Sequence, residues 1–278
     1  MKVSLCTITF RHCLLSLKDI AVWARANGFD GVELWGAHAR NLARTPLYNA
    51  DWLASFGLAT PMLSDYLPTE GERSAIQARA ERLCRLAGHW RAGKIRTFAG
   101  ARGSRSTSAE ERRAIIAALR LMCEVADDHG VRLLVETHPN TLADSLASTL
   151  RLVEEIDHAT LGLNFDVLHV WEGGDDAAEA HRTLRPWIRH YHLKNVRTRE
   201  DLGVFEPANV YAAAGRREGM TPLFDGAFDY DGFLPELDAD AEASLEWFGD
   251  DGFDVLARDR RLLESRSGQS AAVAVGGS

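Results

Sequence analysis

The sequence predicts an α/β fold in which eight parallel strands, each followed by a helix, close into a (β/α)₈ TIM barrel. Short apolar runs alternate with helical stretches along the 278-residue chain, a pattern typical of parallel-sheet proteins. An open doubly wound sheet, the main rival, usually has a glycine-rich turn after its first strand. Here that position is Thr9-Phe10-Arg11-His12, without glycine. No repeat or linker divides the chain, so we expect one catalytic domain over 1–264 and a disordered tail over 265–278.

The predicted strands are short apolar runs, several of which end in polar residues. They cover residues 2–8, 31–36, 58–64, 94–98, 131–136, 161–165, 188–193 and 243–247. The predicted helices have amphipathic periodicity. They cover residues 16–27, 72–90, 108–129, 144–156, 175–186, 231–237 and 251–264.

Local signals support several of these boundaries. Gly28 stands where glycine commonly follows a helix, and Ser108-Ala109-Glu110-Glu111 forms a capping box at a helix start. Residues 45–57 have no clear pattern. A long insertion containing glycine and proline spans about 197–228.

Composition narrows the class of protein. The formal charge of −8 argues against nucleic acid as a partner, because phosphate binding needs a basic surface. The four cysteines are widely spaced and form no CxxC pair, which favours reduced thiols in the cytoplasm. No apolar run approaches transmembrane length and no secretory signal opens the chain. We therefore expect a soluble cytoplasmic protein with no membrane partner.

Polar residues at the predicted strand ends suggest a metal site, because barrel enzymes carry their chemistry at the carboxyl ends of the strands. Glu136, Asp166, His192 and Glu246 form an inward ring of three carboxylates and one imidazole. Without a cation these carboxylates would repel one another. Oxygen-rich ligation with one histidine suits Mn²⁺, Mg²⁺ or Co²⁺ better than structural zinc. The sequence therefore predicts one divalent metal ion, and we favour Mn²⁺.

Further residues share a strand face with these positions. Glu136 and His138 are two residues apart, so they point to the same side and form a candidate metal and acid/base pair. Other pairs with this spacing are Glu33 and Trp35, Ser64 and Tyr66, Arg96 and Phe98, His192 and Lys194, and Glu246 and Phe248. Glu33 belongs to the site or pairs with an arginine. His190 is expected in the core or behind the ligands, and His169 faces the site or solvent.

Longer strings carry a family resemblance. They are Val32-Glu33-Leu34-Trp35-Gly36, Glu136-Thr137-His138-Pro139-Asn140-Thr141, His190-Tyr191-His192-Leu193-Lys194-Asn195, Asn209-Val210-Tyr211-Ala212-Ala213-Ala214-Gly215 and Ser244-Leu245-Glu246-Trp247-Phe248-Gly249. From residue 1 to about 264 the chain resembles the bacterial 3-dehydroshikimate dehydratases of petrobactin-type siderophore biosynthesis. Those enzymes belong to the xylose-isomerase-like TIM barrel superfamily.

The resemblance implies a hydro-lyase that converts the small molecule 3-dehydroshikimate to protocatechuate (3,4-dihydroxybenzoate) with a divalent metal ion. It implies the ligands Glu136, Asp166, His192 and Glu246, and His138 as general base. It places Arg96, Glu33, Tyr66, His169 and Phe248 in the substrate pocket, together with Lys194 and Tyr211. Either of these last two, or a metal-bound water, would supply the proton for loss of the β-hydroxyl. Arg96 is the first candidate for binding the substrate carboxylate, and Lys194 is the alternative.

Three other functions fit these residues less well. A sugar isomerase or epimerase on the same metal-dependent barrel commonly uses two opposed acid/base carboxylates, whereas Glu136 and Glu246 are expected as ligands. A DNA repair endonuclease would need more metal ligands and a basic groove. A non-catalytic scaffold would leave His138 and Lys194 without a reason to lie beside the metal. The oligomeric state stays open, a homo-oligomer included.

Overall fold

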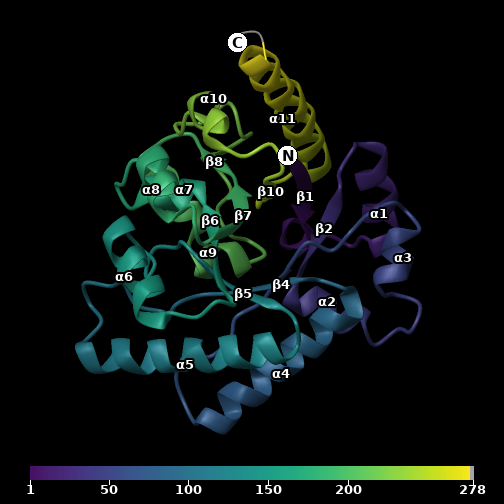
Figure 1. The fold of residues 1–278 in the computed structure, drawn as a ribbon. Helices are drawn as coiled ribbons and strands as arrows, with labels where there is room; N and C mark the ends of the chain where they lie inside the picture. Colours follow the sequence, from purple (N-terminus) through teal and green to yellow (C-terminus); the bar gives the residue numbers. More distant parts are fainter. Residues whose placement is uncertain (276–278) are drawn as a thin grey trace.

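Eight parallel strands form a closed barrel in the computed structural model, which describes residues 1–275 and the side chains as far as Arg266 (Figure 1). Around the barrel the strands follow one another in the order β1, β10, β7, β6, β5, β4, β3 and β2. Their bounds are β1 Lys2–Cys6, β2 Gly31–Trp35, β3 Leu63–Ser64, β4 Lys94–Thr97, β5 Arg132–Glu136, β6 Leu161–Asp166, β7 Ile188–Leu193 and β10 Glu242–Leu245. The predicted (β/α)₈ fold is confirmed.

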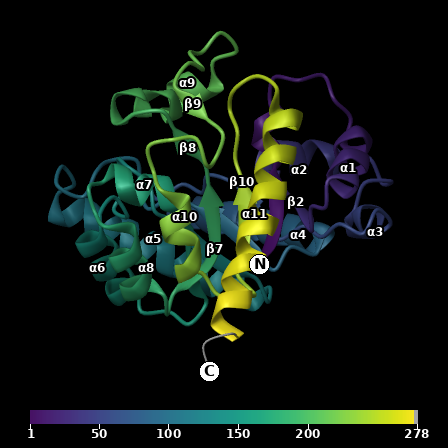
Figure 2. The same ribbon diagram turned by 90° about the horizontal axis from the view of Figure 1, so that it is seen from above.

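Helices surround the barrel and bury its outer face (Figures 1 and 2). They are α1 Leu17–Ala26, α2 Gly36–Leu42, α3 Ala50–Ala54, α4 Arg73–Trp90, α5 Ala109–Asp128, α6 Leu146–Ile156, α7 Val167–Glu172, α8 Ala177–Leu184, α10 Tyr230–Phe233 and α11 Gly252–Val275, with 3₁₀ turns η1 Thr7–Phe10 and η3 Leu234–Glu236. Leu119 and Met122 of α5 are fully buried. Buried Trp90 at the end of α4 donates its indole N–H to the carbonyl of Ala39, at 3.3 Å. Apolar packing between helices and strands is the main stabilising term.

The predicted insertion is ordered around a small second sheet. Strands β8 (Asn195–Val196) and β9 (Met220–Thr221) pair antiparallel, and η2 (Arg199–Phe205) and α9 (Pro207–Tyr211) lie between them in the chain. Figure 2 shows these elements together at the end of the barrel where β7 finishes. The Asn195 amide donates to the carbonyls of Leu223 and Phe228 at 2.7 and 2.9 Å, which anchors the returning chain. The insertion therefore lies where barrel enzymes build their sites.

The structure corrects two sequence expectations. The segment 45–57 contains α3, and β3 has only two ladder residues, with one earlier bridge between Gly31 and Ala59. The tail was expected to be irregular from Ser265, whereas α11 continues to Val275. Arg266 holds this extension by an ion pair with Asp231 and by stacking 3.9 Å from the Phe224 ring centroid. Adding residues to an existing helix costs little, and alanine favours it. Residues 276–278 of the predicted tail lie outside the described part.

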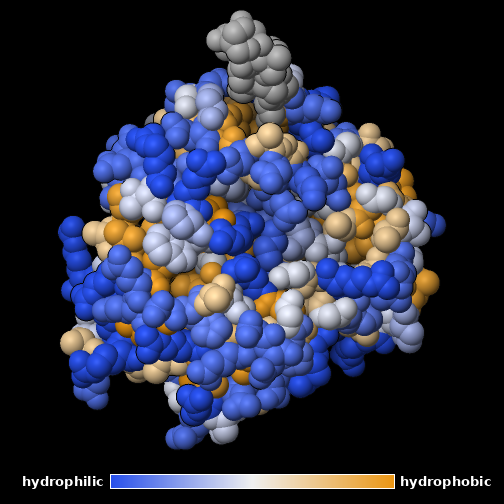
Figure 3. Space-filling model, in the orientation of Figure 1, coloured by the Kyte–Doolittle hydropathy of each residue, from blue (hydrophilic) through white to orange (hydrophobic). Residues whose placement is uncertain are grey.

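Hydrophilic residues predominate on the face drawn in Figure 3, and the hydrophobic ones form small separate groups. Among the described residues, no helix has the length and apolar character needed to cross a bilayer.

The capping box of α5 offers a test of local stability. The Ser108 hydroxyl accepts from the Glu111 amide at 3.2 Å, and the Glu111 carboxylate accepts from the Ser108 amide at 2.8 Å. Ser108→Ala should therefore lower the free energy of unfolding by about 1 kcal/mol, measured by urea denaturation. Ser106→Ala, an exposed serine before the helix, is the control. Equal losses in both variants would contradict the capping role.

Candidate active site

A cavity of about 500 Å³ opens at the carboxyl ends of the barrel strands. It is lined by nine of the predicted site residues, namely Tyr66, Arg96, Glu136, His138, His169, Lys194, Tyr211, Glu246 and Phe248. Three more predicted residues, Glu33, Asp166 and His192, are fully buried and are not among its lining residues. The barrel thus brings together side chains from strands that are far apart in the sequence.

The predicted metal ligands converge at this cavity, where Glu136 and Glu246 are lining residues and Asp166 and His192 are fully buried. We call Glu136, Asp166, His192 and Glu246 the carboxylate–histidine cluster. The Nδ1 atom of His192 lies 3.7 Å from a Glu136 oxygen and 3.5 Å from a Glu246 oxygen. Potential ligand atoms of Asp166, His192 and Glu246 all lie within 4.8 Å of one another.

The donor set fits a divalent ion. His192 Nδ1 is buried and has no hydrogen-bond partner among the described residues, although it faces two carboxylates. Such an unsatisfied atom carries a free-energy cost that a metal ion bound to it would remove. Carboxylate oxygens with one imidazole suit Mn²⁺ or Mg²⁺. Residues in the described part could therefore hold a metal ion.

Lysine and arginine side chains partly neutralise the cluster. The Lys194 ammonium is paired with Asp166 and lies 2.8 Å from Glu246. Burial alone would lower the pKa of Lys194, but Asp166, Glu246 and Glu136 outweigh it and raise this pKa above its usual value. Arg96 Nε lies 2.7 Å from Glu136. Both cations remain charged and are shared between the cluster and the cavity.

His138 follows β5 in a tight turn. Asn140 adopts a positive φ of 60°, which asparagine tolerates better than most residues. The Thr141 hydroxyl closes the turn by donating to the His138 carbonyl at 2.8 Å. His138 Nδ1 lies 2.7 Å from the Pro139 carbonyl, which can only accept, so Nδ1 carries the proton. The lone pair of Nε2 is then available to accept a proton.

The environment of His138 keeps its imidazole neutral. Burial, together with neighbouring His169, lowers the pKa of His138 to about 3. The His138 ring packs 4.5 Å from Phe98 and 4.4 Å from His169, centroid to centroid. Glu172 orients His169 by a 2.7 Å contact with its Nδ1. His138 thus requires no deprotonation before it can act as a base near pH 7.

Arg96 is built to face an anion. Its guanidinium carbon lies 5.4 Å from the Tyr66 ring centroid and 4.9 Å from that of Phe98. Its Nη1 is buried without a hydrogen-bond partner in the described structure. A guanidinium that packs against aromatic rings and has an unpaired N–H donor is suited to binding a planar carboxylate.

Strand-end reasoning missed several residues that support or line the cavity wall. Arg11 donates from Nε to the Val210 carbonyl at 2.6 Å and from Nη2 to the Phe248 carbonyl at 3.4 Å, which joins the first loop to the insertion. Tyr211 of the insertion hydrogen-bonds to the Tyr66 hydroxyl. The lining residues without a predicted role are Ile8, Phe205, Pro207 and Val210, and Arg11 supports this wall from outside the lining. The loop position of Arg11 after the first strand is the one sequence signal that could have pointed to it.

Glu33 does not occupy its predicted place in the substrate pocket. It lies two residues before the cavity-lining Trp35 on β2, which sets it about 7 Å deeper along the strand. There it contacts His192 Nε2 at 3.0 Å. The structure therefore places Glu33 outside the lining of the cavity and in contact with His192.

A family model described as "Xylose isomerase-like TIM barrel" matches residues 21–267. The chain belongs to the xylose isomerase-like TIM barrel family. It is also 46% identical over 274 residues to a Bacillus anthracis protein named 3-dehydroshikimate dehydratase, covering 96% of this chain and 98% of that protein. These matches confirm the predicted family resemblance.

Solved structures agree with this assignment. The crystal structure of the probable 3-DHS dehydratase AsbF, involved in petrobactin synthesis in Bacillus anthracis, has a TM-score of 0.91 and 46% identity, and the match covers 95% of this chain and 99% of that one. An IOLI protein with a bound zinc atom has a TM-score of 0.73 at 15% identity, covering 96% of each chain. The second likeness shows the shared fold alone.

Removing one carboxylate from the cluster should weaken metal binding. We expect Glu246→Gln to reduce Mn²⁺ affinity by at least about tenfold. Mutating a residue that only hydrogen-bonds to a metal ligand already lowers metal affinity by about 10–100-fold. Calorimetric titration of the metal-free protein measures this change. Glu81→Gln, a surface variant on α4, should bind Mn²⁺ as the wild type does. Unchanged affinity in Glu246→Gln would remove Glu246 from the ligand set.

Proposed function

We propose that this protein is a metal-dependent 3-dehydroshikimate dehydratase that forms protocatechuate. The observation that carries the proposal is the arrangement of one cavity, which is lined by the neutral imidazole of His138, by Arg96 and by Glu136 and Glu246 of the carboxylate–histidine cluster. The other two members of the cluster are fully buried. The 46% identity over nearly the whole chain to a protein of that name supports it.

The reaction begins with removal of a proton between the ring ketone and the hydroxyl that will leave. His138 is the base, through the Nε2 lone pair that its Nδ1 hydrogen bond leaves free. A pKa near 3 makes His138 a weak base before substrate binds. An anionic substrate beside it raises that pKa, which improves proton transfer.

Charge then develops on the ketone oxygen. Glu136, Asp166, His192 and Glu246 would hold a divalent ion, which would supply Lewis-acid stabilisation of that charge. Arg96 binds the substrate carboxylate through its open Nη1 donor and so fixes the ring against His138.

Loss of the β-hydroxyl requires a proton at the leaving oxygen. Lys194 and Tyr211 both line the cavity. The Lys194 ammonium carries a proton but is held by two carboxylates, one of them at 2.8 Å. Tyr211 is paired with the Tyr66 hydroxyl. Either group completes the elimination, after which tautomerisation gives the aromatic ring.

The cellular setting is also a proposal. Four free cysteines, three of them buried, suit the reducing cytoplasm. The named relatives favour delivery of protocatechuate to siderophore assembly, and Mn²⁺ remains our preferred ion.

The direct test is the ultraviolet absorbance of protocatechuate formed from 3-dehydroshikimate by metal-stripped protein, before and after Mn²⁺ or Mg²⁺ is restored. Product is expected only with metal. Equal turnover in stripped protein would contradict the metal-dependent mechanism. Absence of product with every metal would remove the dehydratase and place the isomerase or epimerase alternative first.

Substitution of the proposed base separates chemistry from metal binding. We expect His138→Ala to lower kcat by about 10²–10⁴-fold, with the Mn²⁺ affinity nearly unchanged. His129→Ala, an exposed histidine at the end of α5, is the control for turnover. Retention of wild-type kcat in His138→Ala would exclude His138 as the base.

A further inference from the structure

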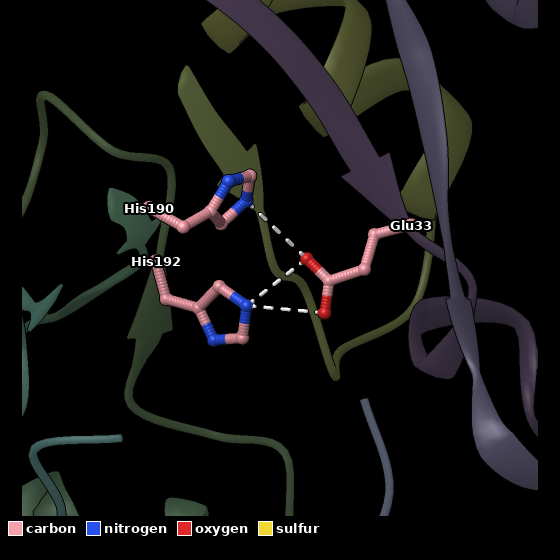
Figure 4. Close-up of side chains that lie close together, drawn as sticks. All are labelled: Glu33, His190 and His192. Carbon is pink, nitrogen blue, oxygen red and sulfur yellow. Dashed lines mark hydrogen bonds and ion pairs between the residues drawn. The ribbon is translucent and has the colours of Figure 1, made fainter. Parts of the chain in front are cut away.

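Beneath the carboxylate–histidine cluster, three side chains meet in the barrel interior. Figure 4 shows Glu33 of β2 pointing at His190 and His192 of β7, and all three are fully buried. Both Glu33 oxygens contact His192 Nε2, at 3.1 and 3.0 Å. His190 Nε2 lies 3.6 Å from a Glu33 oxygen. No step of the proposed reaction uses these contacts directly.

The direction of the Glu33–His192 hydrogen bond follows from the chemistry of the two groups. A carboxylate only accepts, so the proton between them belongs to His192 Nε2. The other ring nitrogen, Nδ1, then faces Glu136 at 3.7 Å and Glu246 at 3.5 Å. In the neutral ring this nitrogen presents a lone pair to the cluster. One contact thus sets both the tautomer and the direction of the imidazole.

Other donors hold Glu33 in place from several strands. The Ser64 hydroxyl of β3 hydrogen-bonds to the carboxylate, and Cys6 Sγ of β1 lies 3.5 Å from it. On the far side, Lys94 Nζ lies 3.1 Å from His190 Nδ1. An ammonium only donates, so His190 carries its proton on Nε2, which faces Ser244 at 2.8 Å as well as Glu33. The carboxylate is therefore fixed independently of His192.

We propose that Glu33 is a positioning residue, whose carboxylate orients His192 so that Nδ1 binds the metal ion. This inference rests on the metal site of the proposed function. Hydrogen-bonded carboxylates behind a ligating histidine commonly fix the ring and raise metal affinity. The competing interpretation is a second metal ion between Glu33, His190 and His192, whose potential ligand atoms also lie within 4.8 Å of one another.

Calorimetric titration of Mn²⁺ into metal-free protein distinguishes these possibilities. The wild type should bind one ion per chain. Glu33→Ala should still bind one ion, about 10–100-fold more weakly, and Glu33→Gln should lose less, because its amide oxygen still accepts from His192. Glu154→Gln, a carboxylate variant at an exposed position of α6, is the control. Unchanged affinity in Glu33→Ala would overturn the proposal, as would two ions in the wild type and one in the variant.

A second measurement does not depend on turnover or on metal. In ¹⁵N-labelled metal-free protein, the His192 Nε2–H proton should give a slowly exchanging downfield signal that disappears in Glu33→Ala. Its persistence would overturn the proposal. Circular dichroism of each variant confirms folding. If Glu33→Ala shows both losses but the metal-loaded wild type forms no protocatechuate, the proposed function is overturned while the role of Glu33 is supported.

Discussion

Repulsion among buried carboxylates is the constraint on which the rest of this site depends. Glu33, Glu136 and Asp166 are almost fully buried within one barrel, where charges interact more strongly than in water. The structure compensates them with Arg96, Lys194 and the ring of His192. Each of these groups comes from a barrel strand or from the residue following one. The rigid sheet therefore fixes the distances between the carboxylates and the groups that balance their charge. A divalent ion held by the cluster would add further positive charge among these carboxylates.

The period of a strand, which is a local property, is enough to locate this site in the sequence. Residues two apart share a face, so Glu136 and His138 can be paired from their spacing alone. How deep a side chain lies inside the barrel cannot be predicted in the same way. Glu33 lies beside Cys6 in the barrel register, and this register depends on how the whole sheet closes. Strand spacing could not predict the contacts of Arg11 for the same reason, because its partners are the carbonyl groups of residues far away in the sequence.

The barrel and the insertion contribute different residues to the site. The strands and the residues just after them supply the cluster and His138, the proposed base. The insertion supplies much of the wall, including Phe205, Val210 and Tyr211. Aromatic rings from both parts surround the cavity, and flat rings of this kind suit a six-membered ring that becomes aromatic. Strand-end residues could be predicted because parallel strands end at one face. The wall could not, since the insertion folds through contacts such as Asn195 with Leu223 that no periodicity encodes.

Lys194 illustrates why one measurement cannot assign a role in such a site. Its ammonium lines the cavity, where a proton donor is required, and it also pairs with Asp166 and Glu246. Removing it takes away a candidate acid and leaves two buried carboxylates less compensated, which changes their affinity for protons and for metal. A loss of turnover would follow from either effect. Only when bound metal is quantified in the same variant does the loss of turnover report on proton transfer, because the electrostatic contribution to the metal site is then known separately.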